Sequence, residues 1–296
     1  MSIPLKSIEE QVIVITGASS GIGLATALTA AKMGAKVVLT ARNEAILTDV
    51  AAGIAREGGD AIAVSADVAQ RASVQKVADA AFQRYGRIDT WVNDAGVSIY
   101  GKLEEVSAED SRRLFDTNFW GVVNGSLVAL AYLKANGGAL INVGSEVSDA
   151  VVPYQGMYCA SKHAVKGFTQ ALRVEVEEIE RAPVSITLIQ PTAVNTPYPQ
   201  HARNYMDREP KLPSPQIDPQ EVADAILDAA CHPRRDVRVG AGAVVNTIVA
   251  KIAPAALADK LFAKQAERQQ RREPPRNPAG ALHRPSTGGQ IRGLGG

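Results

Sequence analysis

The chain has 296 residues, of which 46% are hydrophobic and 21% are charged, and its 32 Lys and Arg nearly balance 31 Asp and Glu. This composition is typical of a soluble globular protein with a large core, and it excludes a disordered chain or a disulfide-stapled miniprotein. A net charge of +1 provides no field that would attract nucleic acid or an anionic membrane. The charge is uneven, because residues 265–296 hold six Arg and two Glu, and ten of these 32 residues are Gly or Pro. We therefore expect a basic, loop-like tail.

Two cysteines, Cys159 and Cys231, are too few for a disulfide framework and lack metal-ligand spacing, so we expect a reducing compartment and no metal. The N-terminal residues contain no apolar run before a cleavage site, which argues against a secretory signal and favours a cytoplasmic location. Residues 240–258 reach the length of a membrane span, but they are weakly apolar, and a lysine and a proline interrupt them. We expect a helix buried in the fold or in a subunit interface.

Short β-branched runs alternate with helical stretches along most of the chain. We predict strands at residues 11–16, 35–40, 60–65, 88–93, 139–144, 184–190 and 236–239. The clearest helical patterns cover residues 107–135 and 154–181. Several strands are apolar on both faces, as strands buried between two helical layers should be.

This alternation predicts an α/β fold, in which helices cover both faces of a doubly wound, mostly parallel seven-stranded sheet (a Rossmann fold). Ligands of such sheets bind beyond the carboxyl ends of the strands. We predict one domain over residues 8–263, followed by the tail at 265–296.

A glycine-rich turn follows the first predicted strand. Residues 16–23 read Thr-Gly-Ala-Ser-Ser-Gly-Ile-Gly and lead directly into a helical pattern. The three glycines allow a sharp turn, close approach of a pyrophosphate to the backbone, and close packing of the helix on the sheet. The helix N-terminus presents N–H groups and a positive dipole end to the phosphates. Such turns also open helices for steric reasons alone, but the strand before this one and the helix after it favour a nucleotide site.

The end of the second predicted strand bears on which dinucleotide binds. An acidic residue there would accept a hydrogen bond from the adenosine ribose, but residues 39–43 contain no carboxylate and include Arg42. A guanidinium pairs bidentately with a 2′-phosphate, which a carboxylate would repel. We therefore predict NADP(H) over NAD(H). The alternative is that Arg42 is a solvated residue that opens the next helix.

Tyr158 and Lys162 place a phenol and an ammonium on the same helical face. Alone, such a pair is also typical of an exposed aromatic–cation contact. Ser145 follows the predicted strand at 139–144, where the sheet would present it to a ligand, and Asn118 lies within the helical stretch that precedes this strand.

If the predicted nicotinamide cofactor delivers a hydride to the carbon of a ketone, a proton donor is needed beside the carbonyl oxygen. Tyrosine has a reference pKa of about 10, and a cation within about 4–6 Å lowers the pKa of an acid by roughly 1–3 units. We expect Lys162 to lower the pKa of Tyr158, so that Tyr158 acts as general acid in reduction and general base in oxidation. Ser145 would hydrogen-bond the substrate oxygen.

The order and spacing of these motifs resemble the ordinary single-domain branch of the short-chain dehydrogenase/reductase family over residues 10–240. The resemblance rests on the glycine-rich turn, Asn118, Ser145 and the Tyr158–Lys162 pair. It implies a nicotinamide-dependent enzyme, and with Arg42 an NADP-dependent one, that interconverts a ketone or an aldehyde and an alcohol by hydride transfer. Lys162 would also hold the nicotinamide ribose, and Asn118 would anchor a water that relays protons.

The resemblance also implies a set of cofactor-binding residues. They are Gly17, Ser19, Ser20, Gly21, Ile22, Gly23, Arg42, Asp67, Val68, Asn93, Ala95, Gly96, Tyr158, Lys162, Pro191, Val194 and Thr196. By itself, Asp67 is more typical of an N-cap of the helix that follows it. Two residues depart from the family's pattern: Thr192 replaces a glycine, which requires a negative φ, and Asp94 replaces an asparagine. Residues 196–219 resemble the family's variable substrate lid, and we predict an extra helix over 244–264.

The ketone or alcohol is not identified by the sequence, because the predicted lid carries charges of both signs. A catalytically silent NADP(H)-binding sensor or an interaction scaffold is the alternative function, and the glycine spacing fits a sugar epimerase or dehydratase poorly. We expect a small-molecule substrate, no nucleic-acid partner and no membrane. By analogy with the family, we also expect a homodimer or homotetramer through the helices at 107–135 and 154–181.

Overall fold

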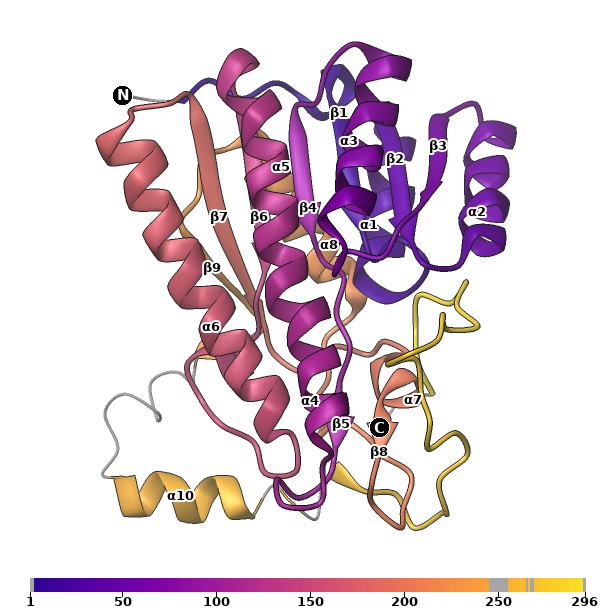
Figure 1. Cartoon of the computed structure of the whole chain (residues 1–296), viewed down its shortest axis with the longest axis vertical. Coiled ribbons are helices and arrows are strands. Elements are labelled where there is room, and N and C mark those ends of the chain that lie inside the picture. Colours follow the sequence, from indigo (N-terminus) through magenta and orange to yellow (C-terminus); the bar gives the residue numbers. More distant parts are fainter. Residues whose placement is uncertain (1–2, 245–254, 265, 267–268, 295–296) are drawn as a thin grey trace.

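Seven parallel strands form the centre of the molecule (Figure 1). The computed structural model describes residues 3–244, 255–264, 266 and 269–294. The strands are β1 Val12–Thr16, β2 Lys36–Ala41, β3 Asp60–Ser65, β4 Thr90–Asn93, β6 Gly138–Val143, β7 Val184–Pro191 and β9 Asp236–Val239. Their order is β3-β2-β1-β4-β6-β7-β9, and every neighbouring pair is parallel. The predicted α/β fold with a doubly wound seven-stranded sheet is therefore confirmed.

Two helical layers cover this sheet. The helices are η1 Ile8–Glu10, α1 Gly21–Lys32, α2 Glu44–Arg56, α3 Arg71–Tyr85, α4 Ala108–Phe115, η2 Asp116–Trp120, α5 Gly121–Asn136, η3 Glu146–Ser148, α6 Gly156–Arg173, η4 Val174–Ile179, α7 Tyr198–His201, α8 Pro219–Cys231 and α10 Ala255–Ala263. Buried side chains of α1, α2 and α8 pack on one face, and those of α3, α5 and α6 on the other. In β1, Ile13 and Ile15 face the first layer, whereas Val12 and Val14 face the second. All four are at most 1% exposed, as expected for a strand buried on both faces.

The two long helical patterns each contain a π-helical segment. The pattern at 107–135 forms α4, η2 and α5, and the pattern at 154–181 forms α6 and η4, where η2 and η4 are π-helical. Part of the extra helix predicted over 244–264 is seen as α10, whereas residues 245–254 lie outside the described residues. The buried helix expected within 240–258 falls mostly in that gap. Among the helices that the structure describes, none combines the length and apolarity needed to cross a membrane.

The tail follows α10 and passes beside α7 and β8 (yellow in Figure 1). Strand β8 (Arg203–Asn204) pairs with β5 (Ile99–Tyr100) in a second, two-stranded sheet. The backbone N–H of Asn204 donates to the carbonyl oxygen of Pro278 at 2.9 Å, and that of Gly289 donates to Ser19 at 2.7 Å. The tail therefore lies against the body, close to the glycine-rich turn after β1.

Candidate active site

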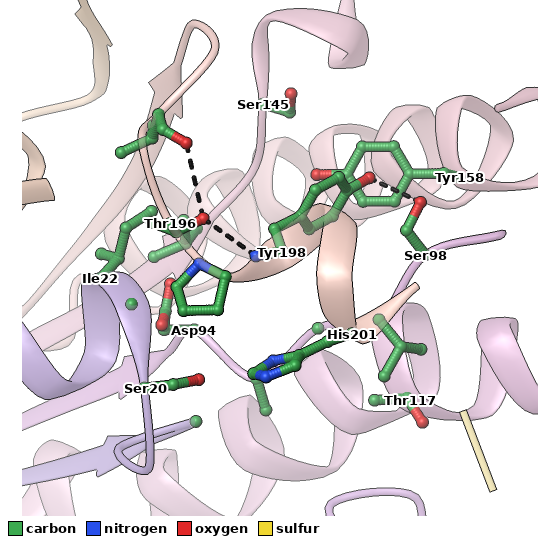
Figure 2. A pocket seen from close by; sticks show the side chains of 18 of the residues that line it. Ser20, Ile22, Asp94, Ser98, Thr117, Ser145, Tyr158, Thr196, Tyr198 and His201 are labelled. Atoms are coloured by element: carbon green, nitrogen blue, oxygen red, sulfur yellow. Dashed lines mark hydrogen bonds between the residues drawn. The ribbon is translucent and has the colours of Figure 1, made fainter. Parts of the chain in front are cut away.

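A cavity opens at the carboxyl ends of the strands around β1, where the strand order reverses. Its lining comes from the turns after β1, β2, β3, β4, β6 and β7 and from α6. The predicted site residues that line it are Gly17, Ser19, Ser20, Gly21, Ile22, Arg42, Asp67, Val68, Ala95, Gly96, Ser145, Tyr158, Lys162, Pro191, Val194 and Thr196. Figure 2 shows Ser20 and Ile22 of the glycine-rich turn across the cavity from Ser145 and Tyr158.

The glycine-rich turn has a backbone that fits a pyrophosphate. Gly17 and Gly21 have φ of +75° and +58°, in the left-handed region that favours glycine. Gly23 lies behind the lining, in the first turn of α1, where a Cβ would stand 2.5 Å from the Gly17 carbonyl oxygen. The start of α1 lines the cavity, and a helix N-terminus attracts an anion. The turn and the helix therefore form a cradle that an added side chain would fill.

Tyr158 and Lys162 lie one turn apart on α6, and the Nζ atom of Lys162 is 5.7 Å from the centre of the Tyr158 ring. This Nζ atom donates a hydrogen bond of 2.8 Å to the carbonyl oxygen of Val143, the last residue of β6. Ser145 follows β6, and its Oγ atom accepts a hydrogen bond of 3.3 Å from the N–H of Val147. The structure thus brings Ser145, Tyr158 and Lys162 to one cavity.

Burial dominates the acid–base state of this group. Burial raises the pKa of Tyr158 well above its usual range, and hydrogen bonds with Ser145 and Tyr198 oppose the rise. Burial lowers the pKa of Lys162 to about 8, and the charge of Asp94 opposes the fall. The Tyr-x-x-x-Lys spacing predicts that Lys162 lowers the pKa of Tyr158, but burial outweighs the neighbouring groups and the net direction is upward. The reason is that an enclosed phenolate loses the solvation of water, which the neighbouring groups do not replace.

Asp94, which stands where the family usually has asparagine, lies against the glycine-rich turn. A Cβ on Gly23 would stand 2.9 Å from the Oδ2 atom of Asp94, and the Asp94 N–H donates to the Oγ1 atom of Thr16 at 3.0 Å. Burial raises the pKa of Asp94 to about 7, and the charge of Lys162 and the N–H of Gly23 oppose the rise. Asp94 and Lys162 therefore stabilise each other's charged forms.

We expect Asp94→Asn to move the alkaline limb of the pH profile of kcat/KM to lower pH by about one unit. The amide removes the charge that holds up the pKa of Lys162, so Lys162 loses its proton at a lower pH. Steady-state carbonyl reduction across the neutral and alkaline range measures the shift. The control is Asp49→Asn, at an exposed position on α2, which should keep the wild-type profile. An unshifted profile in Asp94→Asn would contradict this coupling.

Besides Gly23, two predicted residues do not line the cavity. Asn118, in η2, accepts a hydrogen bond of 2.8 Å from the N–H of Val97 and donates one of 2.9 Å to the Val97 carbonyl oxygen, so it holds the loop after β4. Asn93 is predicted as a cofactor contact, but side chains alternate along a strand, and Asn93 points into the core toward α5. Its Nδ2 atom donates to Asn142 at 2.8 Å, and the Nδ2 atom of Asn142 donates to Thr169 of α6 at 3.0 Å.

Arg42 is half-buried at the end of β2, and hydrogen bonds hold its side chain. Its terminal nitrogens donate to the carbonyl oxygens of Ala281 and Leu282, the latter at 3.0 Å. Burial lowers the pKa of Arg42 and repulsion from Arg113 adds to this effect, whereas Asp67 opposes it. Asp67 accepts a hydrogen bond of 2.7 Å from Arg113 and is not the N-cap of α3.

Thr192 fits the place of the family's glycine. It is not among the described non-glycine residues with a positive φ, so the backbone meets the stated requirement. Its hydroxyl donates a hydrogen bond of 2.9 Å to Glu146, which also lines the cavity. The substitution therefore adds a polar contact without backbone strain.

Several residues around Tyr158 belong to no sequence motif and were not predicted as site residues. The hydroxyl of Tyr198 lies 2.7 Å from the Oγ atom of Ser98 and 2.8 Å from the Oε1 atom of Gln155. The rings of Tyr198 and Tyr158 are 5.3 Å apart between centroids (Figure 2). These residues come from three separate segments, and the position of Tyr198 inside the predicted lid was the one available signal.

The sheet, the glycine-rich turn and the cavity at the strand ends define a dinucleotide-binding α/β protein. The model of the family described as short chain dehydrogenase matches residues 11–207. The chain therefore belongs to the short-chain dehydrogenase/reductase family of oxidoreductases, which bind nicotinamide cofactors.

Relatives and solved structures agree with this assignment. The chain is 46% identical to the uncharacterized oxidoreductase YxnA of Bacillus subtilis (strain 168) over 279 residues, 93% of this chain and 78% of that protein. An alcohol dehydrogenase from the archaeon Thermococcus sibiricus, complexed with 5-hydroxy-NADP, is 28% identical with a TM-score of 0.68, covering 77% of this chain and 94% of its own. A short chain dehydrogenase/reductase from Burkholderia phymatum in complex with NAD is 27% identical with a TM-score of 0.71, covering 92% and 97%.

Proposed function

We propose that the protein is an NADP(H)-dependent oxidoreductase that interconverts a ketone or an aldehyde and an alcohol. The observation that carries the proposal is the convergence of Ser145, Tyr158 and Lys162 on the cavity that also contains the glycine-rich turn. The bound cofactor would supply or accept the hydride. The protein's own residues would orient both reactants, exclude water and move the proton.

Tyr158 is the proposed proton donor in reduction and proton acceptor in oxidation. Because burial raises its pKa, the phenol is protonated at neutral pH, which suits donation to a carbonyl oxygen. Ser145 would donate a hydrogen bond to the same oxygen as charge develops there. Lys162 is positively charged below its pKa of about 8 and would favour the phenolate left after transfer. Asn118 would anchor a water that returns a proton.

The residues proposed to hold the cofactor follow the cavity from end to end. The glycine-rich turn would bind the pyrophosphate, Asp67 and Val68 the adenine, and Lys162 the nicotinamide ribose. Further contacts would come from Ala95, Gly96, Pro191, Val194 and Thr196. Arg42 and Arg113 lie close enough to repel each other, which supports a preference for the 2′-phosphate of NADP(H).

A panel of ketones and alcohols, assayed with both cofactors, tests the proposed function. We expect turnover with a kcat/KM at least about tenfold higher for NADPH than for NADH. A charge-assisted pair between Arg42 and the 2′-phosphate should contribute about 1.4 kcal/mol or more to binding, which corresponds to this factor. Equal or better use of NADH would contradict the cofactor preference. If both cofactors bind but no substrate turns over, the chain is a silent NADP(H)-binding sensor or a scaffold instead.

We further propose that the enzyme is a cytoplasmic homodimer or homotetramer. Trp120, Leu127 and Val174 are 51%, 38% and 47% exposed on η2, α5 and η4. Large apolar side chains on these helices are the kind of surface that a second copy covers. Both cysteines in the structure are free, which agrees with a reducing compartment.

A further inference from the structure

The tail forms part of the wall of the cofactor cavity. Ala281, Pro285 and Ser286 line it together with the turns after β1 and β2. We call residues 281–292 the C-terminal strap. The motifs of the dinucleotide fold do not account for this segment, which lies near the N-terminal end of α2 and beside α7 (Figure 1).

The strap occupies hydrogen-bond donors of the proposed 2′-phosphate site. Arg42 directs both terminal nitrogens at carbonyl oxygens of the strap, with a distance of 3.0 Å to Leu282. Arg113 donates from Nε to the same Leu282 oxygen at 3.3 Å, and its other arm pairs with Asp67 at 2.7 Å. Two half-buried cations, Arg42 and Arg113, are therefore held partly by neutral carbonyl groups.

The strap also bonds to the glycine-rich turn. The N–H of Gly21, at the start of α1, donates to the carbonyl oxygen of Gln290 at 2.9 Å, and the N–H of Gly289 donates to Ser19 at 2.7 Å. Beside the turn, the Nδ2 atom of Asn43 donates to the carbonyl oxygen of Ser286 at 2.9 Å. Backbone carbonyl groups of the strap thus lie where anionic groups of a dinucleotide would bind.

The position of the strap is set by close backbone packing. A Cβ on Gly280 would stand 2.3 Å, and one on Gly288 2.6 Å, from a backbone carbonyl oxygen of the body. Arg292 adds an exposed ion pair with Asp218 at 2.7 Å. A side chain at either glycine would therefore clash with the backbone of the body, at Ala202 or at Ser19, and displace the strap, while the sequence of the body stays unchanged.

We propose that the C-terminal strap sets the cofactor preference by competing with the 2′-phosphate of NADP(H) for Arg42. The proposal rests on the proposed function, because it places the adenosine at the ends of β2 and β3. A phosphate forms a stronger, charge-assisted bidentate pair with a guanidinium than two neutral carbonyl groups do. NADP(H) reaches Arg42 by displacing residues 281–282, whereas NAD(H) leaves them in place. The strap therefore weakens binding of the phosphorylated cofactor selectively.

The test is nucleotide binding to the full-length chain, measured by calorimetry with 2′,5′-ADP and with 5′-AMP, which lacks the 2′-phosphate. We expect Gly280→Val and, independently, Gly288→Val to raise the ratio of 2′,5′-ADP affinity to 5′-AMP affinity about tenfold, because release of the Gly21 N–H favours both nucleotides, whereas release of Arg42 favours 2′,5′-ADP alone. Adding Arg42→Ala to Gly280→Val should remove the gain. Thr287→Val, an exposed strap position, is the matched control and should behave as the wild type.

Each other outcome overturns the proposal in a recognisable way. If both nucleotides bind more weakly to the folded variants, the strap holds the nucleotide instead of competing with it. If the two affinities do not change, or change by the same factor, the strap does not set the preference. Binding of 5′-AMP by the wild type separates these results from failure of the proposed function, in which neither nucleotide binds to any variant. Thermal unfolding of each variant shows whether the body is folded.

Discussion

Tyr158→Phe should lower kcat for carbonyl reduction by about 10²–10⁴-fold, the usual contribution of a positioned general acid. The substitution removes the proposed proton donor and keeps the ring, which packs against Tyr198 with 5.3 Å between centroids. The fold should persist, because phenylalanine lacks only the hydroxyl group and introduces no steric clash. The dissociation constant of NADPH should change by less than about twofold, since the phosphate end of the cavity is untouched. Single-turnover kinetics and fluorescence titration of NADPH measure the two quantities.

The matched control is Tyr132→Phe. Tyr132 lies on α5, away from the cavity lining, and its hydroxyl bonds to Asp79 at 3.0 Å and to Gln75 at 3.1 Å. This variant should keep wild-type turnover and lose no more than about 1 kcal/mol of unfolding free energy. Retained turnover in Tyr158→Phe would remove Tyr158 from the mechanism.

Gly23→Ala should weaken binding of both NADPH and NADH by about ten- to a hundredfold. The new Cβ would stand 2.5 Å from the Gly17 carbonyl oxygen and 2.9 Å from the Oδ2 atom of Asp94. The first of these is backbone, so the glycine-rich turn has to move away from α1. Overpacking of this kind costs about 1–3 kcal/mol. If this cost destabilises the complex with the cofactor, it corresponds to binding that is about ten- to a hundredfold weaker. Titration of both cofactors measures the effect, which should be equal for the two because the pyrophosphate is common to them.

Gly53→Ala is the matched control, because it makes the same substitution at a position where the new Cβ has no steric clash. Gly53 lies in the interior of α2, and a Cβ there meets nothing closer than a terminal nitrogen of Arg56 at 3.8 Å. Alanine in a helix interior should raise the unfolding free energy by about 0.5–1 kcal/mol. Cofactor affinity should not change. If Gly23→Ala also binds both cofactors normally, the glycine-rich turn is not the pyrophosphate site.

The sheet could be predicted because the residue types of each strand indicate whether one or both of its faces are buried. A run such as Val-Ile-Val-Ile in β1 has no polar face, so it has to be buried between two helical layers, and the structure shows this arrangement. The glycine-rich turn was predictable for a similar reason. Gly17 and Gly21 have the positive φ that the turn requires, and Gly23 has no room for a side chain. In both cases the physical constraint acts on neighbouring residues.

Features that depend on long-range packing could not be predicted. The pKa of Tyr158 depends on how completely the fold encloses the phenol, which the spacing to Lys162 does not contain. The inward orientation of Asn93 depends on which strands and helices flank β4. The contact between Arg42 and Leu282 joins residues 240 positions apart, and no pattern at either position indicates it.

The buried polar chain from Asn93 through Asn142 to Thr169 joins β4 and β6 to α6. Apolar contacts let a helix rotate slightly about its axis, whereas hydrogen bonds are directional and define one rotation. Tyr158 and Lys162 sit on the same helix, so the core sets the direction in which both point into the cavity. Tyr198 and the rest of the predicted lid come from another part of the chain. Because the Tyr198 ring packs against the Tyr158 ring, the predicted lid adjoins the proposed proton donor, whereas the core sets the direction of that donor.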